Sequence, residues 1–318
     1  MKRYCFLVIA FLGIFSLKAQ NGPYFGHYMF NPSYLNPGWG GGERDAFVAF
    51  QHRTQWLGYS TSFDGPGGAP STQMLTAIVP IRGFFISSIG INVINDNLGP
   101  VSNLHAMVPL TYSLDLNNSV LSFGVAAGLF SQTLKFDELR FNDSRDPLNV
   151  GSRQTQTAPN LNAGVFFRNN QGLFLGAGVQ NILEPGFTFG MDSLDNIQTM
   201  NFALHGGVSL KVSDNLTLSP TVLVRSDLSA VTFDVGGIVT WSNKMWSGLS
   251  YRRGESMILY LGYSLMENNR LKVGYSFDYV FQDQTAKAAT SHEIFVRYDL
   301  PDLVFGGRKK VKTPRFSF

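Results

Sequence analysis

Apolar residues recur at every second position over long stretches of this chain. From Ser119 to Gln132, leucine, phenylalanine and valine alternate with serine, glycine and alanine, and the same rhythm runs from Leu173 to Val179. Successive side chains of a β-strand point to opposite faces, so this alternation predicts strands with one apolar face and one small or polar face. In residues 271–281, Lys272 and Asp278 fall on the polar face, where a barrel interior accommodates charges that a soluble core does not.

The same template predicts fourteen strands along the chain, an even number of the kind that bacterial outer-membrane barrels have. The first two and the eleventh alternate poorly, so the count is uncertain by two. The predicted strands are centred near Val48, Ala77, Ile91, Val108, Val125, Val165, Ala177, His205, Val222, Val235, Leu249, Leu261, Tyr275 and Val296.

The connections between these strands differ systematically in length. Every even-numbered connection is two to four residues long, namely residues 82–84, 115–118, 169–171, 213–215, 243–244 and 267–269. The odd-numbered ones include three long loops, at residues 54–72, 133–158 and 184–199. Outer-membrane barrels have short turns on the periplasmic side and longer loops outside, whereas a soluble β-sandwich or propeller has no such rule. We therefore expect a transmembrane antiparallel outer-membrane β-barrel with both termini in the periplasm.

Composition agrees with a membrane barrel. Only 15% of residues are charged, 14% are aromatic, and no stretch after the N-terminal segment has the roughly 20 uninterrupted apolar residues of a membrane-spanning helix. Only helices and closed barrels satisfy the backbone inside lipid, so a membrane protein of this composition is a barrel. Aromatic residues near predicted strand ends suit interfacial girdles, with core packing an equally good interpretation of each one: Tyr112, Trp241, Trp246, Tyr251 and Tyr263.

The first 19 residues have the pattern of a signal peptide, with Lys2 and Arg3 before a short apolar run and cleavage near Ala19. The single cysteine, Cys5, lies inside this segment, so the mature chain is expected to have no thiol, disulfide or cysteine metal site. Cleavage leaves 22 basic residues against 22 acidic ones, so we expect no nucleic-acid partner. The expected layout is signal peptide 1–19, N-terminal segment 20–44, barrel 45–300 and basic tail 301–318.

The sequence predicts no catalytic residue, cofactor or metal ion. The five histidines lack ligand spacing, and neither a Gly-x-Ser-x-Gly elbow nor a phosphate-binding glycine loop occurs. His105 and His205 fall on the inward face, where a residue such as Asp234 is a candidate partner across strands. An interior polar network is the favoured interpretation, and a lipid hydrolase that depends on these histidines is the alternative.

Small residues on the inward face leave room in the lumen. The sequence places Gly124, Gly128, Gly176 and Gly178 there. The N-terminal segment is rich in aromatics, prolines and glycines and has no strand pattern, and its aromatic residues are costly to leave in water. We therefore expect residues 28–37 to plug the lumen or to cap its periplasmic mouth, with a simple linker as the alternative.

Several short motifs, in their order and spacing, resemble the PorP/SprF family of type IX secretion membrane proteins from Bacteroidetes. They are dense over residues 20–110, where Trp39 and three glycines stand in place of the family's alanine-rich stretch, and a late match covers residues 291–294. The residues that carry the resemblance are Tyr28, Met29, Phe30, Asn31 and Pro32; Asn36 and Pro37; Arg53, Gln55, Trp56 and Gly58; Gly68, Ala69 and Pro70; and Asn95, Asp96, Gly99 and Pro100.

The resemblance implies a non-enzymatic accessory barrel that helps to export or anchor a large surface protein such as a gliding adhesin. The implied partners are membrane lipid, the C-terminal domain of the secreted protein, and a periplasmic protein of the secretion machinery or one that binds peptidoglycan. The tail is a candidate docking element, with a disordered end as the alternative, through Arg308, Lys309, Lys310 and Lys312. The main alternative function is a channel or transporter for a small or hydrophobic solute.

Overall fold

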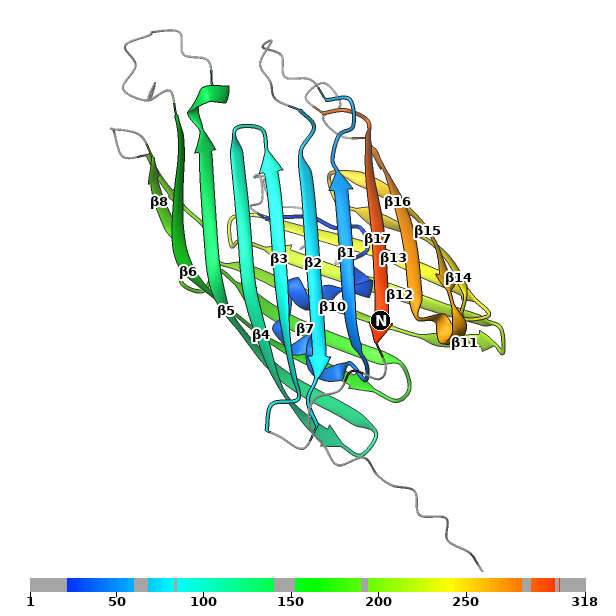
Figure 1. Cartoon of the computed structure of the whole chain (residues 1–318). Coiled ribbons are helices and arrows are strands. Elements are labelled where there is room, and N and C mark those ends of the chain that lie inside the picture. The colour runs from blue at the N-terminus through cyan, green and yellow to red at the C-terminus, as the bar shows by residue number, and fades with distance from the viewer. Residues whose placement is uncertain are drawn as a thin grey trace, which may run out of the picture.

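The chain forms a closed antiparallel β-barrel (Figure 1). A computed structural model describes residues 22–59, 68–82, 85–139, 152–189, 194–281, 287–300 and 303. Its strands are β1(Ala46–Thr54), β2(Ser71–Pro80), β3(Ser88–Leu98), β4(Val101–Leu116), β5(Ser119–Lys135), β6(Arg153–Asn169), β7(Leu173–Gln180), β8(Gly186–Phe189), β9(Leu194–Ile197), β10(Asn201–Val208), β11(Leu210–Ser213), β12(Leu216–Ser226), β13(Val231–Trp241), β14(Met245–Arg252), β15(Ser256–Leu265), β16(Leu271–Val280) and β17(Thr290–Leu300).

The wall has fourteen strands, because β10 and β11 both pair with β12 and form one strand interrupted at Ser209. Each wall strand pairs with its neighbours in sequence, and β1 pairs with β17 from Ala46 opposite Leu300 to Thr54 opposite His292. This last pairing closes the barrel, because it joins the first wall strand to the last one. All fourteen predicted strand centres lie in wall strands, so the predicted fold is confirmed.

The two faces of the wall differ as the alternation predicts. The outward face carries exposed apolar side chains on every wall strand, among them Leu129, Leu175 and Leu249. In an outer-membrane barrel these side chains contact lipid. The inward face is largely polar, and Asp278 is fully buried there. Among the described residues, no helix is long and apolar enough to cross a membrane.

Of the five aromatic residues suggested for a girdle or for core packing, four face outward and one faces inward. Tyr112, Trp241, Tyr251 and Tyr263 point outward and are each 40–46% exposed. Trp246 instead points into the lumen, where it is 3% exposed and its ring lies 5.1 Å from that of Phe30. Position near a strand end does not fix the face; the register of β14 does.

Two predicted long loops contain more regular structure than expected. In the 133–158 connection, β5 runs to Lys135 and β6 begins at Arg153; in the 184–199 connection, β8 and β9 form a hairpin beside β6 (Figure 1). Residues 153–157 read Arg-Gln-Thr-Gln-Thr, polar on both faces, so they have no apolar period to recognise. A cluster of Phe130, Phe136, Phe187 and Phe189 holds the hairpin against the wall.

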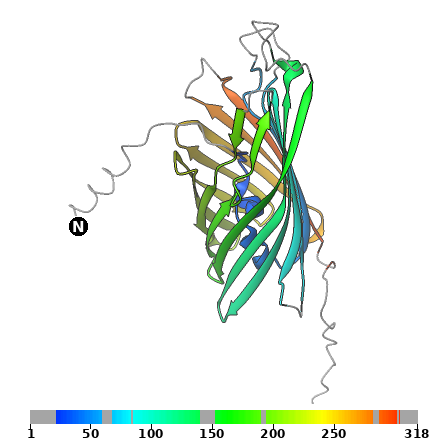
Figure 2. The ribbon, with the colours of Figure 1, turned by 90° about the vertical axis from the view of Figure 1, so that its left-hand side faces the viewer.

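Short 3-10 helices complete the described structure. Three of them lie inside the barrel, η1(Tyr28–Phe30), η2(Pro32–Tyr34) and η3(Pro37–Gly42), and two lie in connections, η4(Phe136–Glu138) and η5(Glu267–Asn269) (Figure 2). The expected signal peptide and the basic tail with Arg308, Lys309, Lys310 and Lys312 lie outside the described residues.

Candidate functional site inside the barrel

Residues 22–44, here called the inner segment, run through the lumen as the three helices η1 to η3 (Figures 1 and 2). Every residue from 31 to 40 is buried. Pro32 and Pro37 start two of the helices, a position that suits the fixed φ of proline. Asn36 caps the third, since its side-chain Oδ1 accepts a hydrogen bond of 2.9 Å from the Gly38 amide.

The inner segment runs lengthwise along the barrel. Gly22 lies in a cavity with Trp56, at the end where the long loops gather, whereas Arg44 shares a second cavity with Arg82 at the end with the short turns. We expected both ends of the mature chain on the short-turn side. The first described residue, Gly22, instead lies at the long-loop end. The segment fills the lumen and must reach the start of β1 at the short-turn end, so it runs from the long loops to the short turns. No pattern in the sequence indicates this direction.

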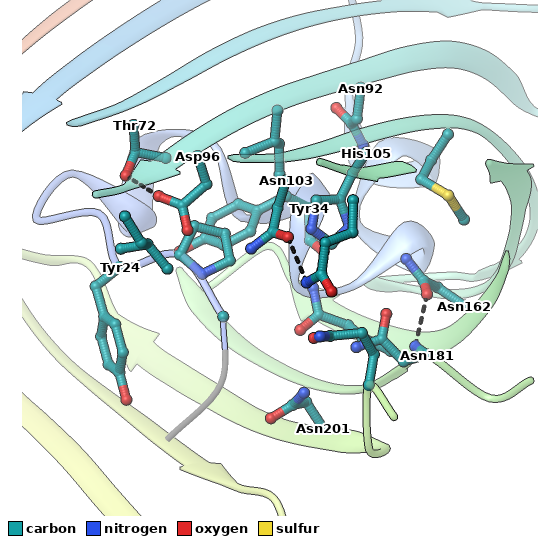
Figure 3. A pocket seen from close by; sticks show the side chains of 18 of the residues that line it. Tyr24, Tyr34, Thr72, Asn92, Asp96, Asn103, His105, Asn162, Asn181 and Asn201 are labelled. Atoms are coloured by element: carbon teal, nitrogen blue, oxygen red, sulfur yellow. Dashed lines mark hydrogen bonds between the residues drawn. The ribbon is translucent and has the colours of Figure 1, made fainter. Parts of the chain in front are cut away.

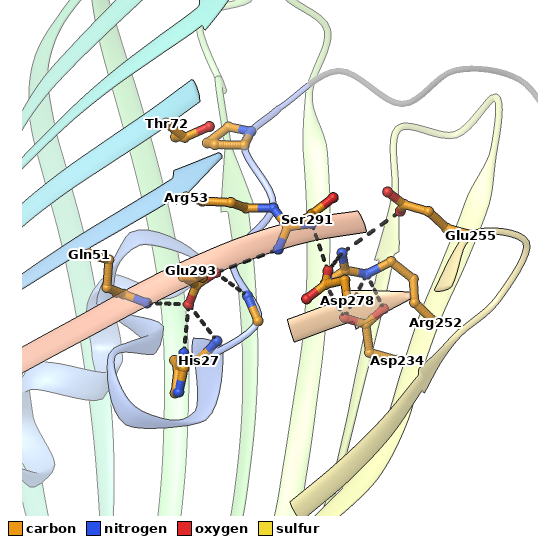
Figure 4. A network of polar contacts seen from close by, with 12 residues as sticks. His27, Gln51, Arg53, Thr72, Asp234, Arg252, Glu255, Asp278, Ser291 and Glu293 are labelled. Carbon is orange, nitrogen blue, oxygen red and sulfur yellow. Dashed lines mark hydrogen bonds and ion pairs between the residues drawn. The ribbon is translucent and has the colours of Figure 1, made fainter. Parts of the chain in front are cut away.

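The carboxylate of Glu293 on β17 anchors the inner segment. It accepts hydrogen bonds from the backbone amides of Gly26 (2.6 Å) and His27 (2.9 Å) and from His27 Nδ1 (2.8 Å) (Figure 4). Glu293 and His27 are fully buried. The His27 ring also stacks on Phe295, with 5.5 Å between centroids. A buried carboxylate with several charge-assisted hydrogen bonds is costly to disrupt, so this contact fixes the segment against β17.

A buried ion network continues from Glu293 along the wall (Figure 4). Arg53 on β1 donates to Asp278 on β16 at 2.7 Å and lies 3.8 Å from Glu293. Arg252 on β14 holds Asp234 on β13 through three hydrogen bonds of 2.9 to 3.1 Å. Arg252 and Arg53 both approach Asp278, so one network links five of the six strands from β13 to β1, all but β15, across the seam where the barrel closes.

Tyr24 of the inner segment packs on this network. The Arg225 guanidinium lies 3.7 Å from the centroid of its ring, and Arg225 Nη1 donates to the Pro23 carbonyl at 3.2 Å. Such a cation-π contact adds to the anchoring of the segment.

The opposite wall binds the segment through its asparagines and serine. Asn31 Nδ2 donates to Thr76 Oγ1 at 2.9 Å, and Ser33 Oγ donates to Asn92 Oδ1 at 3.1 Å. Asn36 Nδ2 donates to the Val165 carbonyl at 2.9 Å and lies 3.1 Å from His205 Nε2.

The remaining family-like residues of the inner segment contact other parts of the interior. Tyr28 donates to Thr221 at 3.2 Å, Phe30 packs on Trp246 and Phe295, and the Pro37 carbonyl accepts from Thr111 at 3.0 Å. Met29 packs on the cluster that contains Tyr28, and Pro32 is buried.

Inward-facing glycines admit the segment. A methyl group at Gly124 would lie 2.2 Å from Pro37, and one at Gly178 would lie 2.0 Å from the Leu35 carbonyl oxygen. A methyl group at Gly176 would meet both His205 and Asn36. Gly128 differs, since its added methyl would meet the wall backbone of β4 at Ala106. Three of the four glycines therefore contact the segment or its His205 partner.

Replacing Gly178 with alanine is expected to dislodge the inner segment without breaking the wall. The added methyl overlaps the Leu35 carbonyl, and overpacking of this kind costs about 1–3 kcal/mol. Chymotrypsin should then cleave the segment faster at its tyrosines and phenylalanines. Gly237→Ala is the matched control, because its methyl would meet nothing closer than 3.5 Å. Equal cleavage rates in the two variants would contradict the tight fit.

The other family-like residues gather at the long-loop rim. Trp56, Gly58 and Gly99 have positive φ angles of 53°, 87° and 62°, which shape the turns that follow β1 and β3. The Gln55 amide donates to the Pro70 carbonyl at 2.8 Å, and the Lys135 amide donates to the Pro100 carbonyl at 2.9 Å. Asp96 points inward, Asn95 bonds to Gln73, and Gly68 and Ala69 precede β2.

Two cavities lie on opposite sides of the inner segment. The one at the short-turn end has a volume of about 910 Å³, and its lining includes Glu43, Arg44, Arg82 and Arg168. The one at the long-loop end has a volume of about 340 Å³, and carboxamides are the most frequent side chains among its described lining residues (Figure 3). The segment therefore divides the lumen between its two mouths.

The model of the type IX secretion system membrane protein PorP/SprF matches residues 17–298. The chain belongs to the PorP/SprF family. It is thus an outer-membrane component of type IX secretion. No curated protein matches it closely enough to count as a relative.

Two solved outer-membrane barrels share the fold of this PorP/SprF chain. The toluene transporter TbuX of Ralstonia pickettii has a TM-score of 0.52 and 10% identity, over 86% of this chain and 93% of that one. A FadL homologue of Pseudomonas aeruginosa has a TM-score of 0.50 and 13% identity, over 87% and 95%. At these identities the similarity establishes the fold alone.

The histidines of the PorP/SprF barrel take part in packing. The ring of His105 lies edge-on to Phe130, with 4.2 Å between centroids, and His205 stacks on Phe166 beside Asn36. The suggested partner Asp234 pairs with Arg252 instead. Arg252 belongs to no recognisable motif of the sequence, and Glu293 falls only within the short match at residues 291–294. Their one sequence signal is a charged residue on the inward face of a strand, as for Asp278.

Proposed function

We propose that this barrel docks and anchors a large secreted surface protein in the outer membrane. It would stand with its short turns and C-terminus in the periplasm and its long loops outside. The role requires no catalysis and no cofactor, because binding alone retains a partner. The relevant periplasmic contacts would be a component of the secretion machinery or a protein that binds peptidoglycan.

The observation that carries this proposal is the filled lumen. The inner segment is bonded to β17 through Glu293, to β2 through Thr76 and to the backbone of β6 at Val165. A passive channel needs a continuous water path, and buried ion pairs of this kind are costly to break for each passing solute. The filled lumen supports a scaffold whose working surfaces are its two rims.

Exposed aliphatic side chains on the long-loop rim suit a protein partner. They follow or precede strand ends, and Leu228 is the most exposed at 78%. They are spread around the rim, since Leu57 follows β1 and Leu228 follows β12, and a large partner that covers the rim would bury them together. The rim residues of this kind are Leu57, Leu98, Leu183, Ile197 and Leu228.

Gentle extraction of a tagged copy, followed by mass spectrometry of what co-purifies, tests the proposal. We expect one large exported protein, and its yield should fall about tenfold or more in a Leu57→Glu and Leu228→Glu double variant. Met266→Glu is the control, since Met266 is 62% exposed at the short-turn end. A barrel that co-purifies with nothing and conducts small solutes would contradict docking and favour the transporter.

The basic tail provides a second, separate contact in this proposal. Replacing Arg308, Lys309, Lys310 and Lys312 with glutamine removes four positive charges close together in sequence. We expect loss of a periplasmic partner from the purified complex and unchanged recovery of the surface protein, because charge attracts an acidic surface only at short range. Unchanged recovery of every protein would show that the tail is not a docking element.

A further inference from the structure

The cavity at the long-loop end has the size and enclosure of a small-molecule site. Its volume is about 340 Å³, near the lower end of the range for ligand pockets. Its floor is the inner segment at Ser33 and Tyr34, and its walls come from the ends of β2 to β7 and β10. Trp56, which follows β1, and Leu98, the last residue of β3, place it at the long-loop rim of the barrel.

Carboxamides are the most frequent side chains of the lining. Of the 24 described residues that line the cavity, ten are asparagine or glutamine, Asp96 is the only carboxylate, and none is lysine or arginine. A carboxamide offers two N–H donors and a carbonyl acceptor without net charge. The lining is therefore suited to a neutral ligand whose own groups both donate and accept hydrogen bonds.

Part of this hydrogen-bonding capacity is used within the wall, and part remains. Asn103 Oδ1 accepts from Gln132 at 2.8 Å, Asn201 Nδ2 donates to the Thr199 carbonyl at 3.1 Å, and Asp96 Oδ1 accepts from Thr72 at 2.6 Å. Among the described residues, Asn103 Nδ2, Asn201 Oδ1 and Asp96 Oδ2 have no partner. These three atoms supply one donor group and two acceptors for a ligand, and the Nδ2 groups of Asn92 and Asn162 add two further donor groups that bond to none of the described residues.

The arrangement of these side chains distinguishes a compact ligand from an extended one. Figure 3 shows Asp96, Asn103, Asn162, Asn181 and Asn201 distributed around the cavity, from several strands and the connection after β7. An extended peptide repeats its amides along a line of roughly 3.3 Å per residue, and it would need partners in rows. Groups that converge from around a ring instead suit a compact molecule with hydroxyls on all its edges.

Aromatic residues add the apolar part of such a site. Tyr24, Tyr34 and Trp56 belong to the lining, together with Met107 and the imidazole of His105. Faces of aromatic rings pack against C–H groups, while the amides bond to hydroxyls. We propose that this cavity binds a neutral mono- or disaccharide. The inference is independent of the proposed docking function.

Direct titration of the full barrel tests the proposal. The protein would be kept in lauryldimethylamine oxide, a detergent without a sugar headgroup, and titrated calorimetrically with glucose, galactose, maltose and N-acetylglucosamine. We expect at least one of them to bind with a Kd below about 10 mM. Glucuronate should bind more weakly than glucose, because its carboxylate would face Asp96.

Variants connect binding to the cavity. Asp96→Ala should weaken binding about tenfold or more, because it removes a hydrogen bond to a charged group. Asn103→Ala and Asn201→Ala should each weaken binding about fivefold, because each removes a hydrogen bond to a neutral group. Asn118→Ala, in the turn between β4 and β5 at the other end of the barrel, should leave affinity unchanged. Electrophoretic heat-modifiability of each variant would establish that it is folded.

Three results would overturn the proposal. One is the absence of binding for every sugar on the panel by folded wild-type protein. Another is equal loss of affinity in Asn118→Ala and the cavity variants. The third is tighter binding of a blocked Ser-Asn-Gly tripeptide than of any sugar, which would identify the cavity as a peptide site.

Discussion

Deletion of residues 24–40 is expected to turn a non-conducting barrel into an open channel. The inner segment occupies the lumen between the two cavities, and fourteen strands enclose a water-filled space once it is removed. Purified barrels in planar lipid bilayers should show this as stable single-channel currents that the full-length protein lacks. Similar currents from both proteins would contradict the plugging role of the segment.

An engineered disulfide provides the matched control for this deletion. Ser33 and Asn92 make side-chain contact at 3.1 Å, and the sequence has no cysteine after Cys5. A Ser33→Cys and Asn92→Cys pair should therefore join the inner segment to β3. The oxidised barrel should stay closed. If locking also abolished recovery of the surface protein, the segment would have to move during secretion; intact recovery would support a static anchor.

Replacement of Glu293 with alanine is expected to destabilise the barrel more than any other single change to the inner face. The substitution leaves the buried amides of Gly26 and His27 and the His27 ring without a hydrogen-bond acceptor, and it removes one of the two carboxylates near Arg53. Breaking a buried pair from one side costs about 3–5 kcal/mol. Guanidinium titration in detergent, followed by tryptophan fluorescence, would measure the loss.

Two further variants separate charge from shape at this position. Glu293→Gln keeps the side-chain volume and one acceptor oxygen, so its free energy of unfolding should lie between those of Glu293→Ala and the wild type. Glu267→Gln removes a carboxylate that is exposed in η5, and such surface changes usually stay within about 0.5 kcal/mol. If Glu293→Ala had no larger effect than Glu267→Gln, the carboxylate would not be the anchor.

The wall of the barrel could be predicted from sequence because alternation is a local property. The apolar and polar faces of a strand can be recognised within a few residues. Even the segments near Val48 and Leu249, where the alternation is poor, were correctly predicted to be strands. The prediction failed where that local signal is missing. Residues 153–157 are polar on both faces, and Trp246 lies near a strand end but faces inward.

The interior could be predicted only in part. The inward glycines indicated space for a filler, and Gly124, Gly176 and Gly178 do border the segment or its His205 partner. The partners of the buried charges could not be predicted, because Arg53, Asp278 and Glu293 meet through registers of strands far apart in sequence. A sequence shows which charges face inward; strand register decides which of them touch.

The position of Glu293 has a consequence for how the barrel assembles. The carboxylate lies on the last strand, and its partners at Gly26 and His27 come shortly before the first strand, to which that last strand pairs. Both ends of the barrel-forming chain therefore meet at one seam, with the inner segment enclosed behind it. A segment bonded to so many strands cannot readily be threaded in after the seam has formed. The segment therefore has to be in place before or while β17 pairs with β1, and a segment left outside at that moment would be excluded from a wall that has already closed.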